Sequence, residues 1–134
     1  MSYLPDIEAQ KLLEEAKKVS ENTYSPYSHF PVGAAVLTAD GTIVCGTNVE
    51  NASYGLTICA ERIALGQAVS IGKTNIKAIA VYCKTNGSAP CGACRQFIIE
   101  FGKEVVVIFM NGEELVQRTI QELLPYAFTK EAMG

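Results

Sequence analysis

Three cysteines and one glutamate have the types and spacing of a metal-dependent hydrolytic centre. Cys91 and Cys94 stand at C-x-x-C spacing, which lets two thiols on one helical turn bind a single metal ion, and Cys59 can supply a third thiol. Three protein ligands leave one tetrahedral position of zinc open, as in catalytic rather than structural sites. Glu61 lies two residues from Cys59, so its carboxylate can stand beside the metal without ligating it. Zinc, a bound water and a nearby carboxylate together predict hydrolysis.

The spacing is also compatible with two other classes of protein. Cys91 and Cys94 could form a redox dithiol, which would make the chain a dithiol oxidoreductase. Alternatively, the cysteines could stabilise a zinc-holding binding module that catalyses nothing. In either case Glu61 would be an ordinary first-turn acid favoured by the helix dipole. The two other cysteines, Cys45 and Cys83, show no paired spacing, and we expect both to be small core side chains.

Both cysteine segments lie where the sequence predicts the start of a helix. Helices are expected over residues 58–71 and 91–101, each after a loop or a strand. Thiolates at helix N-termini are stabilised by free backbone N–H groups and by the positive end of the helix dipole. Three thiolates on one zinc ion still leave an excess of negative charge. We therefore expect one or both of Arg62 and Arg95 to hydrogen-bond the ligand sulfurs from outside the metal's own ligand shell.

Apolar periodicity predicts the elements that must position these residues. An amphipathic helix is expected to begin at a cap on Asp6, Asp40-Gly41 predicts a tight turn between two strands, and a capping box predicts a short helix after Thr119. The expected helices are 6–21, 58–71, 91–101 and the one after Thr119, and the expected strands are 32–38, 42–49, 76–83, 104–110 and 115–118. This order predicts an α/β fold of three layers, α/β/α, with a central mixed five-stranded sheet.

Length, charge and composition limit the class of protein. A chain of 134 residues predicts a single domain over residues 1–134. The five cysteines are an odd number, and the first residues lack the basic and apolar regions of a secretion signal, so we expect a cytoplasmic protein with reduced thiols. A net charge of −3 disfavours nucleic acid, whose binding rests on neutralising phosphates. Without an apolar run of about 18 residues, we expect no membrane partner either.

Beyond these residues, the chain resembles the cytidine deaminases of the small, three-cysteine type, within the cytidine and deoxycytidylate deaminase family. Zinc deaminases share a cysteine-rich zinc site, a glutamate that does not ligate the metal, and a P-C-x-x-C motif. Here C-A-E-R at 59–62 and P-C-G-A-C-R-Q at 90–96 carry that pattern. Further similar motifs occupy 24–28, 30–35, 48–52 and 123–125, so the resemblance spans nearly the whole chain. Residues 48–52 distinguish it from guanine, blasticidin and polynucleotide deaminases.

The resemblance implies a cytidine deaminase-like fold and a hydrolase acting on cyclic amidines. The implied reaction is zinc-dependent hydrolytic deamination of cytidine and 2′-deoxycytidine to uridine and 2′-deoxyuridine, with release of ammonia, as in pyrimidine salvage. One Zn²⁺ per chain would be held by Cys59, Cys91 and Cys94. A zinc-bound hydroxide would attack C4 of the base while Glu61 carries protons to N3 and to the leaving amine.

The resemblance also implies a set of substrate contacts. Asn48 and Glu50 would hold the ribose 3′-hydroxyl, and Phe30 would line the base pocket. Phe128 would stack on the pyrimidine of a neighbouring subunit, in a homotetramer with active sites at subunit interfaces. The other implied substrate-binding residues are Val49 and Ala60. Because a carboxylate accepts a hydroxyl but repels phosphate, Glu50 favours a free nucleoside over a nucleotide or a polymer.

Overall fold

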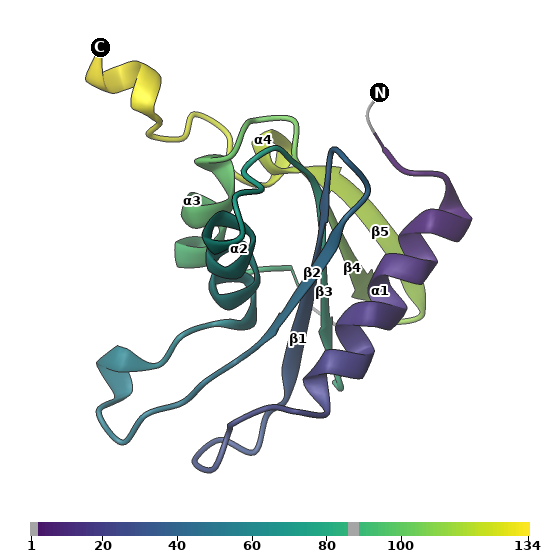
Figure 1. Ribbon diagram of the computed structural model, residues 1–134, viewed down its shortest axis with the longest axis vertical. Helices are drawn as coiled ribbons and strands as arrows, with labels where there is room; N and C mark the ends of the chain where they lie inside the picture. Colours follow the sequence, from purple (N-terminus) through teal and green to yellow (C-terminus); the bar gives the residue numbers. More distant parts are fainter. Residues whose placement is uncertain (1–2, 86–88) are drawn as a thin grey trace.

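A mixed five-stranded sheet with helices on both faces forms the body of the protein (Figure 1). The structure, a computed structural model, describes residues 3–85 and 89–134. The strands are β1 (Val32–Thr38), β2 (Ile43–Thr47), β3 (Ile76–Cys83), β4 (Val106–Asn111) and β5 (Glu114–Thr119), and their order across the sheet is β2-β1-β3-β4-β5. Helix α1 (Asp6–Ser20) covers one face, and α2 (Ala60–Ser70) and α3 (Gly92–Ile99) cover the other. The predicted three-layer α/β/α architecture is confirmed.

The connections explain why the sheet is mixed. Strands β3 and β4 are parallel, because the chain crosses from one to the other through α3. The other neighbouring pairs are antiparallel. Tight turns join β1 to β2 and β4 to β5, and they place Gly41 and Gly112 at φ values of 90° and 67°, which glycine adopts without strain. The predicted turn at Asp40-Gly41 is therefore confirmed.

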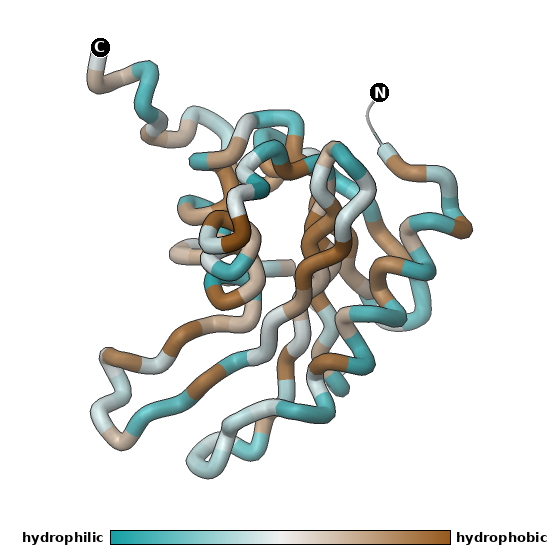
Figure 2. Tube along the Cα trace, in the orientation of Figure 1, coloured by the Kyte–Doolittle hydropathy of each residue, from teal (hydrophilic) through white to brown (hydrophobic). Residues whose placement is uncertain are grey.

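Two apolar clusters, one on each face of the sheet, hold the layers together. On the α1 face, Ala9, Leu12 and Ala16 pack against small strand residues such as Ala35 and Ala80. The cluster on the other face has larger side chains from the strands, α2, α3 and the short helix α4 (Ile120–Leu123). Figure 2 shows the apolar residues concentrated along the central strands and the polar residues along the outer side of α1. In the part of the chain that the structure describes, no helix has the length and apolar character needed to cross a bilayer.

Several element boundaries differ from the expected ones for local reasons. Pro5 occupies the cap position of α1 and Asp6 is its first helical residue, so the expectation of Asp6 as the cap was wrong. The predicted helices at 58–71 and 91–101 begin later, because Cys59 and Cys91 are themselves the cap residues. The capping box at Thr119 is confirmed. The short 3₁₀ helices η1 (Tyr54–Leu56) and η2 (Lys130–Met133) were not expected.

Two segments project beyond the sheet and lie side by side. We call residues 21–31 the first arm and residues 48–58 the second arm (Figure 1). Strand β2 ends at Thr47, two residues before its predicted end, because the chain leaves the sheet there. Val49 then pairs with Tyr24 of the first arm on one side and with Ile58 of its own arm on the other. Residues 48–50 are thus extended, which puts Asn48 and Glu50 on the same side of the chain.

A close approach between α1 and the sheet yields the first testable prediction. A Cβ atom at Gly33 would lie 1.9 Å from the backbone oxygen of Ala16 and 3.0 Å from Cβ of Ser20. The added methyl group would clash with this backbone oxygen, which cannot move aside as a flexible side chain can. Gly33→Ala should therefore lower the free energy of unfolding in urea by about 1–3 kcal/mol or more. Gly66→Ala is the matched control: a Cβ there meets nothing within 4 Å, so this helical position should gain about 0.5–1 kcal/mol. Wild-type stability of Gly33→Ala would contradict the described packing.

Candidate active site

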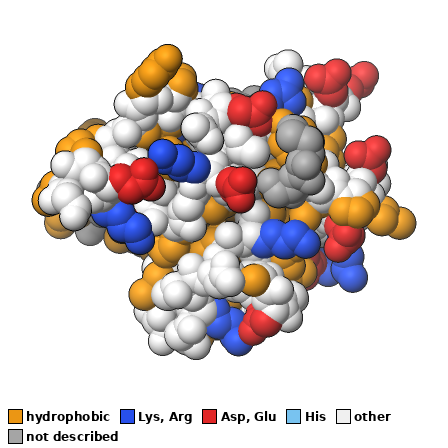
Figure 3. Space-filling view, turned by 90° about the horizontal axis from the view of Figure 1, so that it is seen from above, with side chains coloured by type: hydrophobic (Ala, Val, Ile, Leu, Met, Phe, Trp, Pro, Cys, Tyr) orange, Lys and Arg blue, Asp and Glu red, His pale blue; other side chains and the backbone are white. Residues whose placement is uncertain are grey.

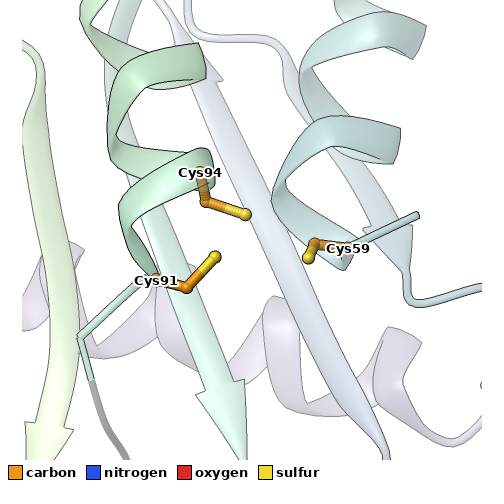
Figure 4. Close-up of side chains that lie close together, drawn as sticks. All are labelled: Cys59, Cys91 and Cys94. Atoms are coloured by element: carbon orange, nitrogen blue, oxygen red, sulfur yellow. The ribbon is translucent and has the colours of Figure 1, made fainter. Parts of the chain in front are cut away.

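Two helix starts bring three sulfur atoms together. Cys59 is the N-cap of α2, Cys91 is the N-cap of α3, and Cys94 lies in the first turn of α3. Their Sγ atoms all lie within 4.8 Å of one another, and the three side chains point toward a common centre (Figure 4). Thiolate sulfur is a preferred ligand of zinc, and three such ligands leave one coordination position for a water or a substrate. The donor set therefore fits a catalytic zinc ion.

The electrostatics of the three-thiol cluster favour a bound cation. The pKa of Cys59 is lowered to about 5, because its sulfur accepts hydrogen bonds from the Cys94 thiol and from Arg62. The pKa of Cys94 is raised, because its thiol donates to Cys59 and is buried. Neighbouring thiols thus cannot all ionise on their own, whereas a coordinated metal ion deprotonates its thiol ligands outright. The free N–H groups at the starts of α2 and α3 add further positive potential.

The two arginines expected to contact sulfur do different things. Arg62 Nη2 lies 3.9 Å from Cys59 Sγ and donates to the backbone oxygen of Thr57 at 3.3 Å. Arg95 instead donates to two backbone oxygens at 2.7 Å, from Nε to Pro90 and from Nη1 to Leu123. Arg62 therefore stands beside a ligand sulfur, while Arg95 ties the turn before Cys91 to the end of α4.

Glu61 is a buried carboxyl group beside the three-thiol cluster. It is the second residue of α2, only 5% of its surface is exposed, and burial raises the pKa of its carboxyl group. It lines a pocket of about 250 Å³ together with Cys59 and Cys91. A buried carboxyl group with a raised pKa, close to a metal site, is suited to exchanging a proton with a neighbouring group.

The pocket collects three of the six residues expected to contact a substrate. Phe30, Asn48 and Ala60 line the pocket together with Glu61, Cys59 and Cys91. The lining residues that sequence analysis missed are Val32, Thr57, Ile58, Val81, Cys83, Ala89 and Pro90. Thr57, Ile58 and Pro90 could have been found, because they adjoin the cysteine motifs. Cys83 was expected in the core, but it lies half-exposed at the end of β3 and lines the pocket, so that expectation was wrong.

Asn48 is fixed by hydrogen bonds at the base of both arms. Its Oδ1 accepts from Thr23 Oγ1 at 2.6 Å and from the backbone N–H of Val32 at 3.1 Å. Its Nδ2 donates to the backbone oxygen of Phe30 at 2.9 Å. The side chain is 8% exposed and borders the pocket, and an amide nitrogen has a second hydrogen to donate.

Glu50 lies in a hollow next to the pocket. Its carboxylate accepts from the hydroxyl of Ser28 and from the backbone N–H groups of Ser28 and Tyr27, and these bonds hold its pKa below the usual value. This hollow is lined by Tyr27, Ser28, Glu50, Tyr54 and Thr57, and Thr57 also lines the pocket. Val49 faces away from Asn48 and Glu50 and is not among the lining residues of either space.

Phe128 lies outside the pocket of its own chain. It follows α4 in a C-terminal tail that leads away from the body (Figure 1), and 63% of its surface is exposed. Gln96 Nε2 of α3 donates to its backbone oxygen at 2.8 Å. The tail is thus attached to the ligand-bearing helix while the aromatic ring stays available for another contact.

The surface carries no single block of charge on the face seen in Figure 3. Acidic and basic side chains alternate there among polar and apolar ones. Such a surface lacks the continuous basic stripe that binds a phosphate backbone.

Comparisons with known proteins agree with this geometry. Residues 6–110 match the family model described as the cytidine and deoxycytidylate deaminase zinc-binding region. The chain is 47% identical over 131 residues to the cytidine deaminase of Sporosarcina psychrophila, and the match covers 96% of this chain and 96% of that protein. It is 45% identical over 131 residues to the cytidine deaminase of Halalkalibacterium halodurans, and this match covers 96% of this chain and 99% of that protein. A crystal structure of cytidine deaminase from Burkholderia pseudomallei superposes with a TM-score of 0.83 at 47% identity, covering 89% of this chain and 98% of that one. Neither the dithiol oxidoreductase nor the binding module finds support here.

Removing one thiol tests the metal centre. Cys91→Ala should reduce bound zinc from about one ion per chain to a small fraction, and should also lower stability, because metal binding is coupled to folding. Zinc would be measured by elemental analysis of protein purified without chelator. Cys45→Ala is the control, since Cys45 lies on β2 away from the three-thiol cluster and the variant should keep its zinc. Full zinc content in Cys91→Ala would overturn the ligand assignment.

Proposed function

This chain belongs to the cytidine and deoxycytidylate deaminase family, and we propose that it acts as a cytidine deaminase on the free nucleosides cytidine and 2′-deoxycytidine. The products would be uridine or 2′-deoxyuridine and ammonia. The observation that carries this proposal is the placement of Glu61 in one pocket with Cys59 and Cys91, two members of the three-thiol cluster. We place this reaction in pyrimidine salvage in the cytoplasm, because its substrates are free nucleosides.

The residues of the pocket suggest how the reaction would proceed. Held by Cys59, Cys91 and Cys94, zinc would supply a water that ionises near neutral pH. Glu61 would accept a proton from the attacking water and pass it to N3 of the base, which makes C4 more electrophilic. Glu61 would then take the remaining proton of the hydroxyl added at C4 and deliver it to the departing amine, so that ammonia leaves and a C4 carbonyl remains. Its burial keeps this proton transfer away from bulk solvent.

The arms would select the sugar and the base. Phe30 lines the pocket and would pack against the pyrimidine ring, beside the backbone of Ala60. Asn48 would donate its second amide hydrogen to the ribose 3′-hydroxyl, and Glu50 would accept from that hydroxyl. The charge on Glu50 disfavours a phosphate group, which supports a nucleoside as the substrate. Val49 would contribute through its backbone, because its side chain faces away.

Loss of the proton carrier tests this function. Wild-type protein should convert the ultraviolet spectrum of cytidine to that of uridine. Glu61→Gln should lower turnover by at least about 10²-fold, since general acid–base help is lost, while bound zinc and the fold remain. Glu14→Gln makes the same chemical change on the exposed side of α1 and should leave turnover unchanged. Near-normal turnover of Glu61→Gln would contradict its role, and wild-type protein that contains zinc but leaves cytidine unchanged would contradict the substrate.

We further propose a homotetramer with active sites at subunit interfaces. Large apolar side chains are exposed on the second arm and in the tail, where a neighbouring subunit would cover them. They include Tyr54, Leu56, Tyr126 and Phe128. In such an assembly Phe128 would stack on the pyrimidine held by a neighbouring subunit, and the arms would be covered.

Dilution and a tail variant together test the assembly. Activity per chain should fall once dilution drives the protein to monomers, as followed by light scattering. At high concentration Phe128→Ala should raise KM roughly 10-fold, the effect of losing one base–aromatic stack. Met133→Ala removes another exposed apolar side chain of the tail and should leave KM unchanged. Full activity of a dilute monomer would count against a shared site.

A further inference from the structure

Ser28 links the carboxylate of Glu50 to the backbone of Phe30. Its hydroxyl donates to Glu50 Oε2, because an ionised carboxylate can only accept. The hydroxyl oxygen of Ser28 also accepts a hydrogen bond from the backbone N–H of Phe30 at 3.1 Å. The Ser28 hydroxyl thus contacts both arms. It bonds Glu50 of the second arm, which lines the hollow, and Phe30 of the first arm, which lines the pocket.

The carboxylate of Glu50 is largely occupied by the first arm. Oε1 accepts two backbone N–H groups, from Tyr27 and Ser28, each at 3.0 Å. A carboxylate has about four acceptor positions, two on each oxygen. Oε1 is therefore filled, and Oε2 keeps one position beside the bond from Ser28. A hydroxyl of a ligand can be accepted only at that remaining position without breaking a bond to the arm.

The backbone of the first arm shows that this turn is specifically held. His29, which directly follows Ser28, has a φ of 56°, a left-handed conformation that residues with a Cβ rarely adopt. Its backbone N–H donates to Ser25 O at 3.0 Å, which closes the turn. Such conformations persist where surrounding contacts fix them, and here Ser28 and Phe30 on either side of His29 are joined by a hydrogen bond.

We infer that Ser28 is a positioning residue, whose hydroxyl orients Glu50 Oε2 toward the sugar and thereby sets the affinity for nucleosides that carry a 3′-hydroxyl. This inference rests on the proposed function, because it takes Glu50 as the acceptor of the ribose hydroxyl. Ser28 lines the hollow of Glu50 and is not among the residues that line the pocket with Glu61, Cys59 and Cys91. Its effect should therefore appear in KM for the nucleoside and leave kcat nearly unchanged.

A pair of substrates separates positioning from a general structural role. For Ser28→Ala, kcat/KM with cytidine should fall about 10-fold, which is the loss expected for a hydrogen bond to a charged group. The fall should come from a higher KM and not from a lower kcat. With 3′-deoxycytidine the same variant should lose less than about 2-fold, because the hydroxyl that Glu50 accepts is missing. Ser28→Thr keeps the hydroxyl and should restore most of the loss. Ser53→Ala, an exposed serine of the second arm, is the matched control and should behave as wild type.

The possible outcomes bear on different claims. Equal losses of Ser28→Ala on both substrates, or no loss on cytidine, would overturn the positioning role. Failure of Ser28→Thr to recover activity while it folds as wild type would overturn it as well. If wild-type protein turned over neither nucleoside, the proposed function would fail and this inference with it, so the two failures are distinguishable.

Discussion

The mutual repulsion of three closely spaced sulfur atoms is the constraint on which the structure depends. Thiolates within 4.8 Å of one another can ionise together only where positive charge compensates them. The chain provides this with two helix starts and with Arg62, which stands 3.9 Å from Cys59. A divalent cation supplies the rest, so the cluster and its metal are electrostatically interdependent. The starts of α2 and α3 must therefore meet, and this requirement sets much of the architecture.

The sheet meets that requirement by its topology. The parallel pair β3 and β4 places α3 on the same face as α2, so both helices begin at one end of the sheet beside the pocket. The opposite face needs no chemistry and is closed by α1, which lies close to the strands because alanine and glycine face it. Arg95 then fixes the turn before Cys91 by holding the backbone of Pro90 and Leu123. Buried apolar packing thus holds the ligands in place with little freedom to move.

How much of the structure can be predicted from the sequence depends on how far apart the interacting residues lie along the chain. Local signals sufficed for the three-thiol cluster, for the position of Glu61 beside it, for the capping box at Thr119 and for the order of helices and strands. Interactions across long stretches of sequence were beyond reach: the contacts of Arg95 with Leu123, and the bonds from Glu50 to the first arm, 22 and 23 residues away. No pattern in the sequence shows which carbonyl oxygen a guanidinium group will reach. For the same reason, the place of Cys83 at the pocket depends on the strand pairing and not on its own neighbours.

The two arms differ physically from the centre that they border. The thiols and Glu61 stand on helices packed against the sheet, whereas Asn48 and Glu50 hold the arms mainly through bonds from side chains to backbone. Such segments tolerate change more readily than packed helices do. A substitution in an arm can therefore change the surroundings of Asn48 and Glu50 without disturbing the metal ligands. Asn48 makes bonds through both Oδ1 and Nδ2, and these bonds hold its side chain in one orientation before any ligand arrives.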